Sequence, residues 1–364
     1  MSDQPTLDPD ALKMMSFTVF SKLEGAFTAG MIHLGDQLGL FRELARRNSP
    51  VPVDELAAAT GLHPRWTREW ASNQVAARVI SCSDVSDESM PLFLTEEAKC
   101  VLARPDHPAF GMGMFHRLPQ TMNALRDMPE SFRTGLGHDY DSHGPEGAVG
   151  IERSFEPWNQ NFLVPSVLPL LEDVREKLAA GGRIADIGCG AGGLALLLAR
   201  TFPKSTVDGF DISLHALDRA RERQAEENAM NVSFLDPRTD PIPQDACYDL
   251  VCTFDCIHDM THPAQMMETI RRAVKPDGTW LLVDIKALDT LEQNMARNPM
   301  ASLLYGVSVL SCMSSAMSAH DGAGLGTLGL PESKARAMAE SAGFTRFRRL
   351  DVDHSVNAFY EIRP

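Results

Sequence analysis

A glycine-rich turn at residues 188–193 constrains the fold of this chain more than any other stretch. It follows the apolar run "RIADI" (183–187) and reads "GCGAGG", with glycines at 188, 190, 192 and 193. Glycine allows a sharp turn and a close approach of the backbone to a ligand. A helix that begins near Gly193 would point free N–H groups at that ligand. The stretch therefore predicts the first strand, loop and helix of an α/β sheet.

The rest of the second half alternates apolar strands with helices. Helices are predicted over 213–229 and 263–274, between the strands 206–211, 231–235, 248–254 and 279–285. Continuous apolar strands between helices are typical of a parallel sheet covered on both faces. Residues 344–363 alternate in two strands joined by a turn. We therefore expect a Rossmann-like, mostly parallel sheet that ends in a C-terminal antiparallel hairpin.

The first hundred residues have a different character. Amphipathic and helical patterns cover 39–47, 51–62 and 63–80, and a polar turn, a short strand and a final helix follow. This order predicts a mainly α winged-helix domain. We divide the chain into a winged-helix domain (1–103), a connector expected to cap a pocket (104–165) and an α/β domain (166–364).

Charge and cysteine content limit the partners. The formal net charge is −15, which disfavours general binding of nucleic acid. Seven cysteines without a C-x-x-C pair favour reduced thiols in the cytoplasm over disulfides or zinc. Histidines and carboxylates do not fall at metal-ligand spacing. The uncharged stretch 298–320 is long enough to span a bilayer, but it holds six serines, so we expect no membrane span.

An acid at the end of the second strand narrows the ligand to an adenine nucleoside. Asp211 lies 18 residues after Gly193, where a carboxylate can accept hydrogen bonds from ribose hydroxyls. NAD and S-adenosylmethionine fit this feature equally, and a glycine turn without a ligand is the remaining alternative. Asp186 can hold the ammonium of a methionine moiety but would repel a pyrophosphate. The closing hairpin and the lack of room for a separate dehydrogenase substrate domain also favour S-adenosylmethionine.

Four segments carry a resemblance to a known family. They read "ADIGCGAGG", "FDIS", "YDLVCTFDCIHDMTHP" and "AVKPDGTWLLVDI". They resemble the successive motifs of class I S-adenosylmethionine-dependent methyltransferases. The N-terminal region resembles the dimerisation domain of bacterial and plant small-molecule methyltransferases in this class. The resemblance implies S-adenosyl-L-methionine as cofactor and a homodimer formed through the N-terminal domain.

The resemblance also implies roles for individual residues of the cofactor site. Asp211 would bind the ribose, and Ile212 would pack on the adenine. Asp236 is our choice for the adenine amine, although Asp240 is an alternative because "FLDPRTDP" departs from the usual pattern. The residues expected to line the methionine part or to lie beside the cofactor are Asp186, Gly188, Cys189, Gly190, Phe254 and Asp255.

His258 is the candidate catalytic residue. Its segment, "CIHDM" (256–260), resembles the part of plant O-methyltransferases in which a histidine is the general base. A hydroxyl acceptor must lose its proton, and a histidine can take it. A purely structural histidine is an equal alternative. A sulfur acceptor is already nucleophilic and needs no base.

The acceptor site is expected under the connector and the 298–320 stretch, both rich in Met. Candidate acceptor-binding residues are His116, Arg117, Tyr140, His143, Trp158 and Tyr305. We expect metal-independent methyl transfer to oxygen or sulfur of a small-molecule acceptor. One alternative is an S-methyltransferase of a small thioether or thiol acid, as in dimethylsulfoniopropionate-type pathways, without a base. Another is a winged-helix transcriptional regulator whose methyltransferase-like domain senses a ligand.

Overall fold

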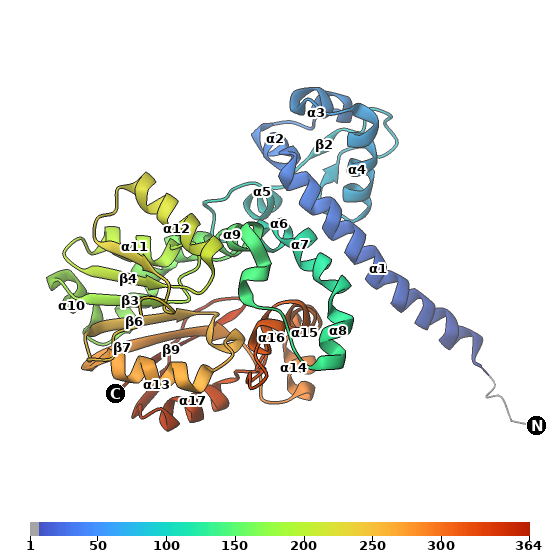
Figure 1. The fold of residues 1–364 in the computed structure, drawn as a ribbon. Helices are drawn as coiled ribbons and strands as arrows, with labels where there is room; N and C mark the ends of the chain where they lie inside the picture. The colour runs from blue at the N-terminus through green and yellow to red at the C-terminus, as the bar shows by residue number, and fades with distance from the viewer. Residues whose placement is uncertain (1–6) are drawn as a thin grey trace, which may run out of the picture. The chain divides into compact units, whose positions relative to one another are not determined.

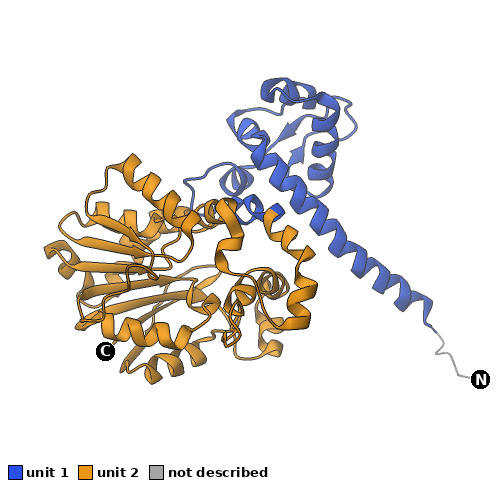
Figure 2. Ribbon diagram, in the orientation of Figure 1, with its two compact units in different colours: residues 1–119 blue, residues 120–364 orange. Residues whose placement is uncertain are grey.

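The computed structural model describes residues 7–364 in two compact units. Unit 1 covers residues up to Pro119 and unit 2 runs from Gln120 to Pro364 (Figure 2). The boundary between the two units, at Pro119 and Gln120, falls inside the segment 104–165, which we expected to be a connector.

Unit 1 is built from helices around one apolar cluster. A small antiparallel hairpin, β1 (Ser81–Cys82) with β2 (Leu92–Phe93), forms the wing. Phe41, Leu56 and Trp70 are buried in the cluster. The helices are α1 (Pro9–Gln37), α2 (Leu40–Arg46), α3 (Val53–Thr60), α4 (Pro64–Ala76), α5 (Glu96–Leu102) and α6 (Met112–His116), with α7 (Leu118–Asn123) crossing the division. The winged-helix expectation is confirmed.

Two helices of unit 1 differ from the prediction. The helix expected over 63–80 ends at Ala76, because Arg78 adopts a left-handed φ of 60° and Val79 N–H turns back to the Gln74 carbonyl. The 29-residue helix α1 was not predicted as an element. It begins after Asp8, whose carboxylate accepts hydrogen bonds from the backbone N–H groups of the first turn.

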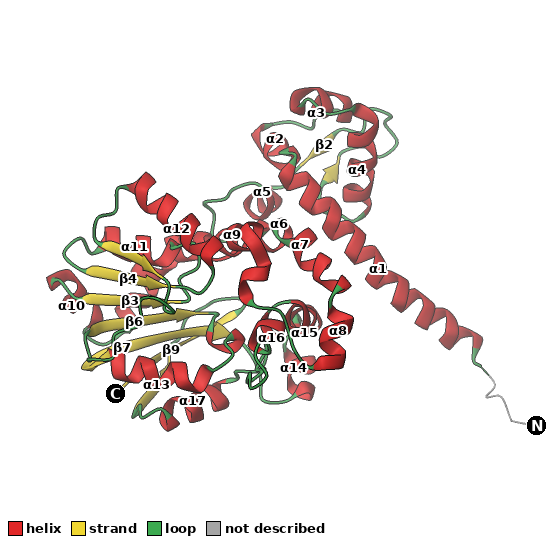
Figure 3. Ribbon diagram, in the orientation of Figure 1, coloured by secondary structure: helices red, strands yellow, loops and turns green. Residues whose placement is uncertain are grey.

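Unit 2 contains a seven-stranded sheet in the order β5-β4-β3-β6-β7-β9-β8 (Figures 1 and 3). The first five of these strands are parallel, and β9 pairs antiparallel with both β7 and β8. The expected mostly parallel sheet with a closing hairpin is therefore confirmed. The bounds are β3 (Arg183–Ile187), β4 (Thr206–Phe210), β5 (Val232–Leu235), β6 (Tyr248–Phe254), β7 (Val274–Ile285), β8 (Arg346–Arg349) and β9 (Asn357–Arg363).

Helices bury both faces of this sheet. Alternate residues such as Ile184 and Ala185 belong to two separate apolar clusters, one on each face. The helices and single turns are α8 (Met128–Thr134), η2 (Tyr140–His143), α9 (Gly144–Phe162), α10 (Val174–Ala180), α11 (Gly193–Thr201), α12 (Leu214–Glu227), η5 (Ile257–Asp259), α13 (Pro263–Ala273), α14 (Leu291–Arg297), α15 (Ala301–Leu310), α16 (Cys312–Ala316) and α17 (Glu332–Ser341). The uncharged stretch 298–320 forms the short helices α15 and α16. Across residues 7–364, no helix combines the length and apolar character that a bilayer crossing requires.

Candidate functional site

The glycine turn connects β3 to α11 at the carboxyl end of the parallel strands. Gly188 and Gly190 have φ of 73° and 53°, a conformation that other residues adopt at a cost. A Cβ on Gly188 would lie 2.6 Å from the Cβ of Cys256, so no side chain fits there. Cys256 therefore fills the space beside Gly188, whereas the atom nearest to a Cβ on Gly190 would be 4.0 Å away, so a ligand can approach the backbone closely at Gly190. Cys189 is buried, and burial raises the pKa of its thiol well above the usual value.

Two buried aspartates flank the turn. Burial and then the nearby Asp211 raise the pKa of Asp186 to about 8, and its Oδ2 has no hydrogen-bond partner. Asp211 accepts hydrogen bonds from the N–H of Gly190 and of Ser213, each at 2.8 Å. Burial raises the pKa of Asp211, and these bonds partly oppose it. Asp186 thus has an unused acceptor that a cationic group would satisfy.

The residues expected at the adenine end are linked to one another. Ile212 is half exposed, with 48% of its surface accessible, so it offers an apolar face. Arg238 donates to the Ile212 carbonyl at 2.8 Å and pairs with Asp236, which lowers the pKa of that carboxyl. Asp240 is exposed and accepts from the Thr239 hydroxyl. Arg238 therefore links Asp236 to Ile212, whereas the Asp240 carboxylate is bonded to Thr239.

The end of β6 carries a strained aspartate. Asp255 has a φ of 48°, which is unusual for a residue with a side chain. Asn357 on β9 donates to both carboxylate oxygens of Asp255 at 2.6 Å. Burial and then Asp284 raise the pKa of Asp255. Phe254 packs edge-on against Phe359.

His258 forms a buried pair with Asp284, the last acid of β7. His258 Nδ1 lies 2.7 Å from Asp284 Oδ1, and both side chains are 2% exposed. An ionised carboxylate only accepts hydrogen bonds, so Nδ1 donates and the lone pair of neutral His258 is on Nε2. Burial alone would lower the pKa of His258, but Asp284 and Cys312 outweigh it and raise the pKa well above 6.5. This is the geometry of an oriented base.

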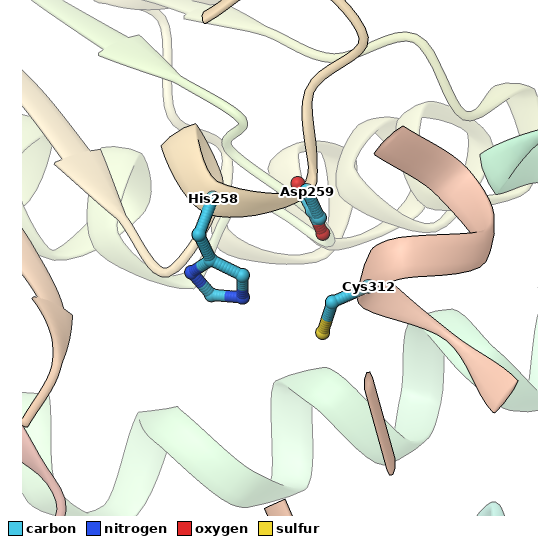
Figure 4. A group of neighbouring side chains, drawn as sticks. All are labelled: His258, Asp259 and Cys312. Atoms are coloured by element: carbon cyan, nitrogen blue, oxygen red, sulfur yellow. The ribbon is translucent and has the colours of Figure 1, made fainter. Parts of the chain in front are cut away.

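Cys312, from the start of α16, approaches the other side of the imidazole. Cys312 is one of the neighbours that raise the pKa of His258, and Figure 4 shows the ring, the thiol and Asp259 around one space. Donor atoms of these three residues lie within 4.8 Å of one another. These three residues therefore lie where they could hold a metal ion, because packing of α16 on η5 brings Cys312 beside His258 and Asp259.

The expected acceptor-binding residues belong to both units. His116 and Arg117 are in unit 1, and the other four are in unit 2. His143 is buried, and its Nε2 lies 2.9 Å from the Ser311 hydroxyl, next to Cys312. Tyr140 packs edge-on against His143. These contacts give His143 a structural role that fastens residues 140–143 to the α15–α16 junction.

Trp158 and Tyr305 differ in their surroundings. Trp158 packs edge-on against His354 at 4.6 Å and also touches Phe359, the neighbour of Phe254. Tyr305 on α15 is 38% exposed. Trp158 therefore lies in an aromatic cluster that continues to the end of β6, whereas Tyr305 lies partly exposed on α15.

Sequence reasoning missed Asp284, Asn357 and Cys312. Asp284 had a signal, since it is an acid near the carboxyl end of an otherwise apolar strand, where open sheets bind ligands. Asn357 and Cys312 had none, because their positions depend on the insertion of β9 beside β7 and on helix packing.

Two known protein families match this chain, one in its N-terminal part and one in its C-terminal part. Residues 178–330 match a family described as methyltransferase domain, and residues 26–104 match the Rv2258c-like winged HTH domain. The ubiquinone biosynthesis O-methyltransferase of Actinobacillus pleuropneumoniae is 28% identical over 104 residues, which are 27% of this chain and 43% of that protein. The chain spans less than half the length of the first curated relatives that it matches.

Solved structures share the fold over nearly the whole chain. Human N-acetylserotonin methyltransferase, in complex with S-adenosylmethionine, matches with a TM-score of 0.65 and 18% identity over 99% of both chains. A mitomycin 7-O-methyltransferase matches with a TM-score of 0.65 and 21% identity over 98% of this chain and 99% of that one. The likeness establishes the two-part architecture.

Proposed function

We propose that this chain, which belongs to the S-adenosylmethionine-dependent methyltransferases with an N-terminal winged-helix domain, methylates an oxygen atom of a small molecule. The observation that carries the choice of oxygen is the His258–Asp284 pair. It supplies a buried, oriented base, which a hydroxyl acceptor needs and a sulfur acceptor does not. The O-methyltransferases among its relatives support the same choice.

The residues at the glycine turn fit the cofactor. S-adenosylmethionine supplies a methyl group activated by an adjacent sulfonium. The unpartnered Oδ2 of Asp186 suits the cofactor's ammonium, and the open backbone at Gly190 allows close approach. Asp211 would bind the ribose hydroxyls. Ile212 and Asp236 would meet the adenine, one by packing and one by a hydrogen bond.

His258 and Asp284 would act on the acceptor. Nε2 takes the hydroxyl proton while Asp284 holds the ring and stabilises the imidazolium that forms. Burial of the pair keeps water away from the reacting oxygen. Asn357 fixes Asp255 at the end of β6 as a positioning residue. We propose that catalysis needs no metal, since no step assigned to these residues uses one.

The partner we propose for unit 1 is a second copy of the chain. Between residues 12 and 27, α1 exposes several apolar side chains: Leu12, Met15, Phe17, Phe20, Leu23 and Phe27, each more than half exposed. Such a surface marks an interaction site. All seven cysteines are free thiols, which supports a reducing compartment such as the cytoplasm.

A DNA-binding regulator has less support. On α4, Arg65 pairs with Glu69 and Arg68 pairs with Asp54, so these arginines are already neutralised. Sequence-selective binding in a gel-shift assay at physiological salt would reverse this ranking.

Two measurements test the proposal. Calorimetry should detect binding of S-adenosylhomocysteine and not of NAD; the reverse result would refute the cofactor. Release of S-adenosylhomocysteine should then be followed with a panel of phenols, carboxylic acids, alcohols and thiols. We expect turnover with an oxygen acceptor that His258→Ala reduces by a factor of about 10²–10⁴. Turnover confined to thiols or thioethers, unaffected by His258→Ala, would instead identify the S-methyltransferase.

A further inference from the structure

Three side chains of the types that bind metal ions lie together: the His258 imidazole, the Asp259 carboxylate and the Cys312 thiol. His258 and Asp259 come from η5, and Cys312 opens α16 (Figure 4). The nitrogen, carboxylate oxygen and sulfur of these residues lie within 4.8 Å of one another. His258 is buried, and the other two are half-buried, so the group is shielded yet within reach of an ion.

The donor set and its spacing suit zinc. Zn²⁺ takes Cys sulfur, His nitrogen and carboxylate oxygen at about 2.0–2.3 Å, in tetrahedral geometry, so its ligand atoms lie roughly 3.3–3.8 Å apart. The observed spacing is within about 1.5 Å of that value. Small rotations of the Asp259 and Cys312 side chains would close the difference. Three protein ligands leave the fourth position for water.

The surroundings of His258 also match a metal-binding histidine. Ligating imidazoles donate their second ring N–H to a carboxylate, which fixes the ring and raises its basicity. Asp284 accepts that bond from His258 Nδ1 at 2.7 Å, so Nε2 is the nitrogen presented to Cys312. Asp284 places a carboxylate beside the ring, which favours a cation there.

We propose that His258, Asp259 and Cys312 form a Zn²⁺ site, and that zinc reversibly inhibits the enzyme by occupying the Nε2 lone pair that accepts the proton of the methyl acceptor. On binding, the Cys312 thiol releases its proton to solvent, and so does Nε2 of protonated His258. The inhibition rests on the proposed function of His258. Metal binding itself does not.

Binding of Co²⁺ can be followed by its absorption spectrum, so it tests the metal site without an activity assay. The full chain, freed of metal with a chelator, is titrated with Co²⁺. We expect one equivalent to produce the absorption band of a thiolate–cobalt bond, and Zn²⁺ to abolish it. Cys312→Ser should lose the band, whereas Cys100→Ser, which removes a half-buried thiol of unit 1, should keep it. Asp284→Asn should weaken metal binding by about 10–100-fold. Binding of S-adenosylhomocysteine checks the fold of each variant.

The outcomes test metal binding and inhibition by zinc separately. Absence of the band, or its persistence in Cys312→Ser, would overturn the metal site. With an acceptor from the screen, zinc should inhibit turnover and chelator should restore it, and Cys312→Ser should raise the half-inhibitory zinc concentration at least about tenfold. If the band forms but zinc leaves turnover unchanged, the inhibition fails, and with it the role of His258 as base, while the metal site stands.

Discussion

Replacing Asp186 by Asn should stabilise the cofactor-free protein while weakening cofactor binding. Burial raises the pKa of Asp186 from the ordinary 3.8 to about 8. The folded state therefore holds a proton that the unfolded chain gives up, and the contribution of Asp186 to stability becomes more unfavourable as pH rises from about 4 to about 8. An asparagine has the same shape and no ionisation to suppress.

The two pKa values set the size of the effect. At pH 7 the linkage relation gives about 4 kcal/mol of lost stability for Asp186, and at pH 5 about 2 kcal/mol. We therefore expect Asp186→Asn to raise the free energy of unfolding by up to about 4 kcal/mol at pH 7, with a gain roughly half as large at pH 5.

Urea unfolding at the two pH values measures this difference. Asp249 is the matched control, since it is also a buried acid of the sheet but both of its oxygens are paired, with Lys275 and with the Arg183 N–H. Asp249→Asn should lower stability by about 1–3 kcal/mol. If Asp186→Asn also lowers stability at pH 7, or if its gain does not shrink at pH 5, the reasoning about Asp186 is wrong.

Cofactor binding provides the second half of the test. In the proposed site the ammonium of the cofactor pairs with ionised Asp186, so binding of S-adenosylhomocysteine at pH 7 should release about 0.9 proton, because the carboxyl is mostly protonated below a pKa of about 8. Calorimetry in buffers with different ionisation enthalpies counts this proton. In Asp186→Asn the proton should not be released, and affinity should fall by about 10–100-fold.

Three other predictions concern the base, the dimer and the turn. Because Asp284 raises the pKa of His258, turnover should increase with pH through a value above 6.5, and Asp284→Asn should move that rise to lower pH; an unmoved profile would contradict the pair. Phe20→Glu on α1 should weaken self-association at least about tenfold in analytical ultracentrifugation, whereas Val85→Glu, also exposed, should not; equal effects would refute the α1 interface. Gly188→Ala should abolish binding of S-adenosylhomocysteine, because the added Cβ would lie 2.6 Å from the Cβ of Cys256 and displace the turn; retained affinity would show that the turn tolerates the shift.

The sheet was predictable where burial decides the pattern. Strands β3 and β6 have the bounds expected from sequence, since both are apolar runs buried on two faces. Helix α1 escaped prediction because its apolar residues do not keep to one inward face: Phe17, Phe20 and Phe27 point to solvent in the single chain. If a second copy of the chain covers these side chains, the lack of a single inward apolar face on α1 is explained by an interface between the two copies.

The candidate site was predictable only in part. Asp186 and Asp211 follow from their places at strand ends, and the structure places both beside the glycine turn, although their roles remain predictions. The contacts of His258 do not follow from sequence. They require β7 to lie beside β6 and α16 to pack on η5, and such contacts depend on the whole tertiary structure.

Strand β9 lies between β7 and β8 in the sheet but is the last strand to be synthesised, so the site is completed late in translation. Asn357, the first residue of β9, holds Asp255 at the end of β6, and all seven residues of β9 are buried. During translation, a nascent chain that has already made the glycine turn and His258 still lacks this strand and the support for Asp255. Methyl transfer should therefore begin only after residues 357–363 have left the ribosome, and shortened fragments should bind cofactor poorly.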